Sequence, residues 1–239
     1  MNQSSDERLE DIRRFYEILE SLEKRVGGKR TLANCNGHMD WPERGVYFFF
    51  EPGEMRTISG SGLRVVRVGT HGLKEGSQTT LWKRLRQHQG TLKSGGGNHR
   101  GSVFRRHVGA AMIARDGWTG PAARDWNISG SAPRTVRDAE IPLERAVSKH
   151  INIMPFLWLA IEDVPGPKSQ RGVIERNAIA LLSNYYSGDW SIDPASENWL
   201  GKWAKREEIR RSGLWNVNHI SDHYQPHHLG LLQSVVSKM

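Results

Sequence analysis

The chain has 239 residues, a formal net charge of +8, a pI of about 9.8 and a single cysteine. This length supports one substantial core with extensions, or two small domains at most, and we favour one domain. The lone Cys35 excludes an internal disulfide and a cysteine-based zinc site, which fits a reducing, cytoplasmic setting. No apolar run approaches the roughly 20 residues that span a bilayer, so we expect no membrane partner. The basic charge attracts polyanions such as nucleic acid, but is equally compatible with a basic protein that binds none.

The first part of the chain is predicted to form one helix and then two strands. Apolar residues recur at helical spacing over residues 9–26, and we interpret this helix as a packing element. Residues 46–50 are aromatic and apolar, and residues 63–68 are rich in β-branched side chains, which is typical of strands. Because turn-forming Pro, Gly and Ser residues separate the two strands, we expect an antiparallel pair.

A capped helix and a glycine-rich loop are predicted next. Thr79 or Thr80 provides an N-cap, the helix runs to about Gln89, and Gly90 is a natural stop. The loop that follows lacks the lysine and hydroxyl residue of a nucleotide-binding phosphate loop. It leads into a helix predicted over residues 102–115.

The second half of the chain is predicted to contain one buried strand between helices. Residues 117–137 are polar and rich in Gly, Pro and Ser, and we interpret them as an irregular insertion. A short helix is expected over 143–150, a buried strand over 154–161 and a further helix over 171–184. The predicted class is therefore α/β in the α+β sense: a small three-stranded antiparallel sheet flanked by helices, with an N-terminal helix and a C-terminal extension.

The last 53 or so residues are rich in tryptophan and histidine. We expect the tryptophans to pack this tail onto the domain, although stacking on unpaired bases is an alternative. The residues concerned are Trp190, Trp199, Trp203 and Trp215. His219 and His223 have a spacing that would place both on one helical face. No cysteine or suitable carboxylate completes a tetrahedral set, so we do not predict zinc there.

Glu175 is out of place on the predicted helix 171–184. At about 100° per residue it falls between Leu182 and Ile179, within an apolar arc. Burying a carboxylate alone is costly, so it needs a cation, a hydrogen-bonding partner or a metal. Two interpretations remain open: an ion pair with an arginine, or a ligand for magnesium, which takes one or two carboxylates with waters and substrate phosphate.

Arg84 and His88 lie one turn apart on the helix that ends near Gln89. His88 is close to its apolar face and Arg84 is on the flank of that face, so both can border a cleft above the sheet. Arg84 is also compatible with a solvated arginine between Lys83 and Arg86. His88 is also compatible with a half-buried histidine bonded to backbone.

The order of these residues resembles that of the GIY-YIG nucleases, a family named for two short strand motifs. Those motifs read GVY at residues 45–47 and RVG at residues 67–69 here. They are followed by Arg84 and His88 in an R-x-x-x-H helix, and then by a strand and a helix that bears Glu175. The combination is much more specific than any of its parts.

This resemblance implies a domain organisation and an activity. The nuclease domain would span residues 45–186 with an insertion around 94–150, after an N-terminal helix and lead-in at 1–44. Residues 187–239 would form an extension packed on it. The implied activity is endonuclease hydrolysis of DNA phosphodiester bonds with Mg²⁺ or Mn²⁺. The alternatives are a catalytically impaired nucleic-acid-binding module on the same fold, or a protein that acts on RNA.

The resemblance also implies roles for individual residues. Tyr47 matches the tyrosine that activates or positions the attacking water, and Arg84 the arginine that contacts the scissile phosphate. His88 would assist the base, and Glu175 would bind the metal. Arg67 stands where the family has a tyrosine, so either Arg67 binds phosphate or the base machinery is altered.

Further residues are expected to support the site or to contact nucleic acid. Gly69 either tolerates a bend at the strand end or permits close approach near the site, and Gly45 belongs to the first motif. Asn184 is the candidate for an asparagine that the family carries after its glutamate. The expected nucleic-acid contacts are basic or polar residues: Arg67, Lys83, Arg86, Asn98, His99, Arg100 and Arg105.

Overall fold

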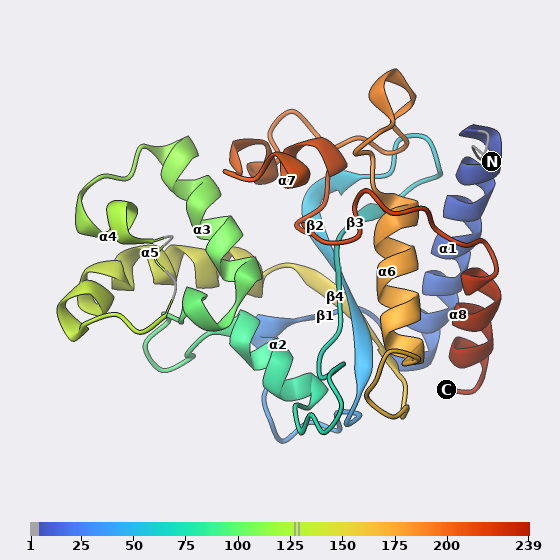
Figure 1. Cartoon of the computed structure of the whole chain (residues 1–239), viewed down its shortest axis with the longest axis horizontal. Coiled ribbons are helices and arrows are strands. Elements are labelled where there is room, and N and C mark those ends of the chain that lie inside the picture. The colour runs from blue at the N-terminus through green and yellow to red at the C-terminus, as the bar shows by residue number, and fades with distance from the viewer. Residues whose placement is uncertain (1–4, 127, 129) are drawn as a thin grey trace.

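The computed structural model describes residues 5–126, 128 and 130–239. Within these residues, an antiparallel four-stranded sheet of order β1-β4-β2-β3 separates two groups of helices (Figure 1). The strands are β1 (Arg30–Thr31), β2 (Gly45–Met55), β3 (Leu63–Gly69) and β4 (Pro155–Ala160). The α+β class is confirmed, but the expected sheet of three strands gains a fourth. Because β1 has only two residues, no periodic pattern in the sequence can reveal it.

Helices cover both faces of the sheet. One face packs against α1 (Ser5–Val26), α6 (Gln170–Leu182) and α8 (His228–Ser237). The other side carries α2 (Leu81–Gln89), α3 (Val103–Asp116), α4 (Gly120–Asp125), α5 (Arg134–Asn152) and α7 (Glu207–Ser212). Four short 3-10 helices are described as well: η1 (Leu32–Asn34), η2 (His99–Gly101), η3 (Gly188–Trp190) and η4 (Leu200–Trp203). In the described part of the chain, none of the helices is both long and apolar enough to cross a membrane.

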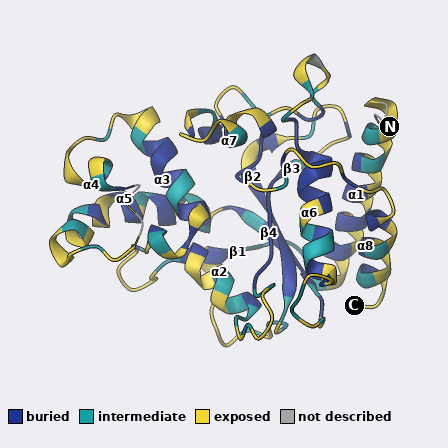
Figure 2. Ribbon diagram, in the orientation of Figure 1, coloured by how far each residue is buried: buried dark blue, intermediate teal, exposed yellow. Residues whose placement is uncertain are grey.

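Alternate side chains of β2 enter two different cores. Val46, Phe48 and Phe50 pack with α1, α6 and α8, whereas Tyr47 and Phe49 pack on the side of α2 and α3. A strand has a side-chain period of two, so a strand covered on both faces is apolar throughout. The sheet is accordingly buried in the middle of the molecule (Figure 2). The run of residues in β2 thus fixes the phenol of Tyr47 on the α2 side.

A β-bulge turns Arg67 of β3 to the same side. Phe49 pairs with Arg67, but the next residue of β2 pairs with Val65, which leaves Val66 as an extra residue. Val66 belongs to the core on the α2 side, and the Arg67 guanidinium lies 4.8 Å from the ring centre of Phe104 in that core. Two consecutive side chains therefore face α2 and α3.

The insertion between α2 and β4 is more helical than expected. The stretch 117–137, predicted to be irregular, contains α4 and the start of α5, apart from residues 127 and 129, which lie outside the described residues. Sequence patterning missed most of α5 because its inward side carries two buried carboxylates, Glu140 and Glu144. Each is neutralised by an arginine from another element.

The tail is anchored by two of its tryptophans. Trp199 and Trp215 are buried as expected, and their indole N–H groups donate to one carboxylate oxygen of Glu51 in β2, at 2.9 and 3.0 Å. The same expectation is wrong for Trp190, whose side chain is 75% exposed, and Trp203 is 37% exposed. A buried carboxylate on β2, rather than apolar contact alone, therefore holds this part of the tail.

Candidate active site

The phenol of Tyr47 and the imidazole of His88 meet on the α2 side of the sheet. Tyr47 Oη lies 2.8 Å from His88 Nε2, and both side chains are buried. The other ring nitrogen, Nδ1, lies 2.8 Å from Ser102 Oγ. Ser102 is the N-cap of α3, and its hydroxyl accepts a hydrogen bond from the amide of Arg105 at 3.2 Å. A continuous chain of polar groups therefore links the phenol to a helix terminus.

His88 is held in its neutral form. Burial lowers the pKa of His88 well below its ordinary value, and the nearby charges of Arg84, Arg67 and Arg105 lower it further. A neutral imidazole has one protonated nitrogen and one acceptor nitrogen. One nitrogen of the neutral His88 ring can therefore accept a hydrogen bond from Tyr47 while the other donates to Ser102.

Local signals in the sequence set the position of α2. The Thr80 hydroxyl caps the helix by accepting from the Lys83 amide at 3.3 Å, and the helix ends at Gly90 with φ 85°. That backbone conformation favours glycine. The predicted start and stop of this helix are confirmed. Arg84 is half-buried on it and donates to Gln87 Oε1 at 2.9 Å, so its guanidinium is not locked into the core.

Two glycines lie where any side chain would clash with neighbouring atoms of the sheet. Gly69 pairs with Tyr47 across the two strands, and a Cβ at Gly69 would lie 2.4 Å from Tyr47 Oη. A Cβ at Gly45 would lie 2.4 Å from the backbone oxygen of Leu159 in β4. No side chain tolerates such distances. The phenol therefore lies directly over Gly69, and β2 approaches β4 closely at Gly45.

Gly69→Ala is expected to destabilise the protein by about 1–3 kcal/mol, because the added methyl group overlaps the Tyr47 ring and hydroxyl. Urea unfolding measures this change. Gly230→Ala is the matched control, since no heavy atom lies within 4 Å of a Cβ added there on α8. It should be neutral or slightly stabilising. Equal effects of the two substitutions would contradict the steric role of Gly69.

Glu175 of α6 reaches the end of β3. Its Oε1 accepts a hydrogen bond from the Thr70 amide at 3.0 Å. Burial raises the pKa of Glu175, and this rise is opposed by the Thr70 amide and by the charges of Arg67, His219 and Arg84. The positive charges of Arg67 and Arg84 therefore favour the ionised form of this carboxylate.

Arg67 shares the interior of the site with Tyr47 and Glu175. It is buried, and its Nη1 donates to the backbone oxygen of Trp215 at 2.8 Å. Its Nε, also buried, has no hydrogen-bond partner among the described residues. Burial lowers the pKa of Arg67, while the nearby Tyr47 and Glu175 raise it. An arginine remains charged in proteins, so Arg67 brings a cation with an unused donor to the site.

Apart from Arg67, the expected nucleic-acid contacts fall into two groups in the structure. Lys83, Arg86 and Asn98 line one hollow of about 450 Å³ beside α2, together with backbone of the glycine-rich loop. Both basic side chains are exposed there. This group is placed on the surface next to the helix that carries Arg84 and His88.

His99, Arg100 and Arg105 belong to the other group, and the surface role expected for them is wrong. Glu144 Oε1 accepts from the amide of His99 at 2.6 Å, and its Oε2 accepts from Arg105 Nε at 3.1 Å. His99 and Arg105 are fully buried. Arg100 makes a bidentate pair with Glu140, at 2.6 and 2.7 Å. Buried carboxylates of α5 therefore bind all three side chains.

The side chain of Asn184 bonds to residues outside the candidate site. It follows the end of α6, where its Nδ2 donates to the backbone oxygen of Ile192 at 2.8 Å. Its Oδ1 accepts from the Ile192 amide and from Arg8, both at 3.1 Å. The side-chain amide of Asn184 therefore links the loop at Ile192 to α1. This is a structural role, whereas the resemblance implied a place in the active site.

The donors around Glu175 suit a magnesium ion better than zinc. In the parts of the chain that the structure describes, no three His, Cys, Asp or Glu side chains gather as a metal site. Zinc requires such a set of protein ligands. Mg²⁺ retains several waters and binds through one or two carboxylates plus substrate phosphate. A single carboxylate at the edge of a cation-rich site fits that pattern.

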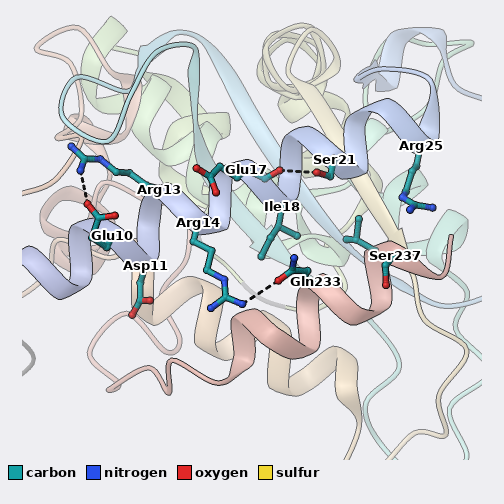
Figure 3. Close-up of a pocket in the computed structure, with 11 residues that line it drawn as sticks. Glu10, Asp11, Arg13, Arg14, Glu17, Ile18, Ser21, Arg25, Gln233 and Ser237 are labelled. Atoms are coloured by element: carbon teal, nitrogen blue, oxygen red, sulfur yellow. Dashed lines mark hydrogen bonds and ion pairs between the residues drawn. The ribbon is translucent and has the colours of Figure 1, made fainter.

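A larger hollow elsewhere is unconnected with these residues. It measures about 610 Å³ and lies between α1 and α8, on the face of the sheet opposite Tyr47 (Figure 3). Its charged residues are partly paired: Arg13 bonds Glu10 at 2.5 Å, and Arg14 donates to Gln233 at 3.0 Å. Tyr47, His88 and Glu175 are not among the residues that line it.

Comparison with known proteins identifies the family. A family model described as the GIY-YIG domain matches residues 6–239. No curated protein and no solved structure matches the chain. The matched range includes both strand motifs, α2 and α6, with Tyr47, His88 and Glu175 on them. Because the match extends over almost the whole sequence, this protein belongs to the GIY-YIG domain family.

Proposed function

We propose that this protein is an endonuclease that hydrolyses DNA phosphodiester bonds with Mg²⁺ or Mn²⁺ as cofactor. Membership of the family suggests a nuclease-like function. The observation that carries the proposal is the contact between Tyr47 Oη and Nε2 of the neutral His88, at 2.8 Å, beside Arg67, Arg84 and Glu175. A base, phosphate-binding cations and a metal-binding carboxylate are the groups that phosphodiester hydrolysis needs.

Tyr47 and His88 would act together as the base. In the tautomer in which His88 Nδ1–H donates to Ser102, Nε2 accepts the hydrogen bond from the Tyr47 hydroxyl. The attacking water gives a proton to the Tyr47 oxygen as the phenol proton passes to His88. Tyrosine alone is a poor base at neutral pH because its pKa is about 10, so the nearby positive charge of Arg67 would have to favour the transfer of the proton from water.

The charged side chains would bind the phosphate. Arg84 donates to its non-bridging oxygens, where negative charge develops in the transition state, and the unused Nε of Arg67 adds a second cation. Glu175 would hold the metal ion. Bound Mg²⁺ or Mn²⁺ would supply further neutralisation of the scissile phosphate.

The hollow beside α2 would take the flanking DNA backbone. Lys83, Arg86 and Asn98 line it, and they lie on or next to the helix that carries Arg84. Phosphate contacts of this kind position a duplex without reading its sequence. The formal charge of +8 adds a salt-dependent attraction.

The test is nicking of supercoiled plasmid by purified protein with Mg²⁺, with EDTA as a reference. Glu175→Gln is expected to lower the nicking rate about 10²-fold, because the neutral amide binds Mg²⁺ poorly. Glu197→Gln is the matched control, since that side chain is 93% exposed and makes a surface ion pair with Lys202 at 2.8 Å. Equal nicking by wild type and Glu175→Gln would refute the catalytic proposal.

A second candidate function is a binding module on the same fold that does not cut. The observation in its favour is Arg67, which is buried at the place of the family's tyrosine. DNA binding with a steep salt dependence, but without metal-dependent nicking, would establish this alternative. Competition between DNA and RNA of equal length would show which nucleic acid the protein prefers.

A further inference from the structure

A hollow of about 510 Å³ lies where the end of α6 and the loop after it meet the start of α1. Its lining combines two aromatic side chains, Tyr186 and Trp190, with Arg8 and with residues 220–224 of the tail. We call it the aromatic hollow. Helix α6 also carries Glu175, so the aromatic hollow and the candidate active site share one helix.

The two aromatic side chains of the hollow face solvent. Tyr186 is 73% exposed and Trp190 is 75% exposed. Side chains of this size are usually buried for most of their surface, and exposed apolar groups that gather in one place mark a binding surface. Trp199 and Trp215, which follow in the same tail, are buried. Packing of the tail therefore explains those two tryptophans and leaves Trp190 without a role in the core.

Hydrogen bonds fix the backbone of the loop that presents these rings. The side-chain amide of Asn184 bonds both backbone groups of Ile192, at 2.8 and 3.1 Å, and so closes the loop. Within the loop, the Ser187 amide donates to the Asn184 oxygen at 3.1 Å, and the Trp190 amide donates to the Ser187 oxygen at 2.9 Å. The indole of Trp190 is thus held out from a bonded turn.

Arg8 brings a positive charge to the hollow. Its Nη2 donates to the Ser183 backbone oxygen at 2.8 Å and its Nη1 to Ser187 Oγ at 3.0 Å. These acceptors are uncharged, so they orient the guanidinium without neutralising it. The acidic residue of the lining, Asp222, already has a partner, because its Oδ2 lies 2.7 Å from His219 Nδ1. An anionic group can therefore approach Arg8.

A second arginine flanks the aromatic side chains. The Arg211 guanidinium lies 4.4 Å from the ring centre of Tyr185, and its Nη2 donates to the Tyr185 oxygen at 3.0 Å. The ring of Tyr185 in turn meets that of Tyr186 edge to face, with centres 4.8 Å apart. The ion pair of Arg211 with Glu207 is exposed and therefore weak. The exposed rings thus lie between two cations.

Aromatic faces beside cations are the features by which proteins hold single-stranded nucleic acid. Each base has a π-face that stacks on an aromatic side chain, and the phosphates of the strand are attracted to nearby basic groups. We infer that the aromatic hollow binds an unpaired base of DNA, which stacks on Trp190 beside Tyr186 while a phosphate of the strand lies near Arg8. The choice of DNA rests on the proposed function, and the inference names its substrate class: DNA with a single-stranded segment.

Binding without catalysis tests this inference. Fluorescence anisotropy in EDTA compares a labelled oligothymidylate with a blunt duplex of the same length. We expect Trp190→Ala to lower affinity for the single strand about tenfold, because stacking on one base contributes about 1–3 kcal/mol. Affinity for the duplex should change by less than about twofold, since paired bases offer no free face. Trp190→Phe keeps an aromatic face and should retain most of the single-strand affinity.

Trp203→Ala is the matched control. It removes another partly exposed tryptophan, from η4, which does not line the aromatic hollow. Its affinity for both DNAs should equal that of wild type. Thermal unfolding of each variant shows that the comparison is made on folded protein.

The outcomes separate this inference from the proposed function. Unchanged single-strand affinity in Trp190→Ala would overturn the inference, and so would an equal loss on both DNAs or an equal loss in Trp203→Ala. A wild-type protein that does not bind the single strand would overturn it as well. None of these results concerns nicking, which Glu175→Gln tests. Conversely, a selective effect of Trp190 in a protein that does not nick plasmid would sustain the stacking site and refute the endonuclease.

Discussion

Replacement of Arg84 by alanine is expected to lower plasmid nicking about 10³-fold, because one guanidinium aimed at developing phosphate charge contributes that much in comparable reactions. Its contacts within the protein are few: Gln87 Oε1 at 2.9 Å and the Gly101 oxygen at 3.5 Å. The fold does not depend on it. Its positive charge lowers the pKa of both His88 and Glu175. The loss should appear in kcat more than in KM.

Arg86→Ala provides the control for Arg84→Ala, since it removes the same charge from the same helix. Arg86 is exposed and lines the hollow beside α2 rather than the Tyr47 site. We expect it to weaken DNA binding and to reduce its salt dependence, with kcat within about threefold of wild type. If the two alanine variants lose activity to the same extent, Arg84 has no special role at the scissile phosphate.

Arg105→Ala is expected to destabilise the protein by about 3–5 kcal/mol, the usual cost of removing one partner from a buried ion pair. Arg105 is fully buried, and it bonds the Glu144 carboxylate, the His88 oxygen at 2.9 Å and Ser148 Oγ at 2.9 Å. Without it, Glu144 keeps a buried charge with His99 as its remaining partner. Urea unfolding at neutral pH measures the loss.

Arg106→Ala is the neighbouring control on α3. Arg106 is only half-buried, and we expect its replacement to change the free energy of unfolding by less than about 1 kcal/mol. The comparison also decides between two roles for Arg105. If Arg105→Ala reduces DNA affinity but leaves stability unchanged, Arg105 contacts nucleic acid, as the sequence predicted.

Much of the side of the fold that carries Tyr47 and His88 could be predicted because its sequence signals are local. Thr80 and Gly90 mark the ends of α2, and the aromatic run after Gly45 marks β2. The helical spacing of Arg84 and His88 follows from the sequence alone. Glu175 was recognisable as a carboxylate on an apolar arc, and the structure shows its burial offset by an amide and by nearby basic side chains.

The remaining features depend on contacts between distant segments. The hydrogen bond between Asn216 and Val68 joins residues 148 positions apart, and no local sequence pattern near either residue predicts it. Similarly, the composition around Arg105 suggests a basic surface, and only the packing of α5 reveals the carboxylate that neutralises it. Charge pairs of this kind leave no periodic trace in a sequence.

The alternation along β2 couples the stability of the fold to the placement of the Tyr47 hydroxyl. Tyr47 lies between Val46 and Phe48, whose side chains enter the opposite core. If the pairing register of β2 shifted by one residue, every side chain would move to the opposite face of the sheet. The Tyr47 hydroxyl would then lie among aliphatic groups, and apolar side chains would take its place beside His88. Selection for a well-folded protein therefore preserves the alignment of the Tyr47 hydroxyl with His88, whatever that hydroxyl does.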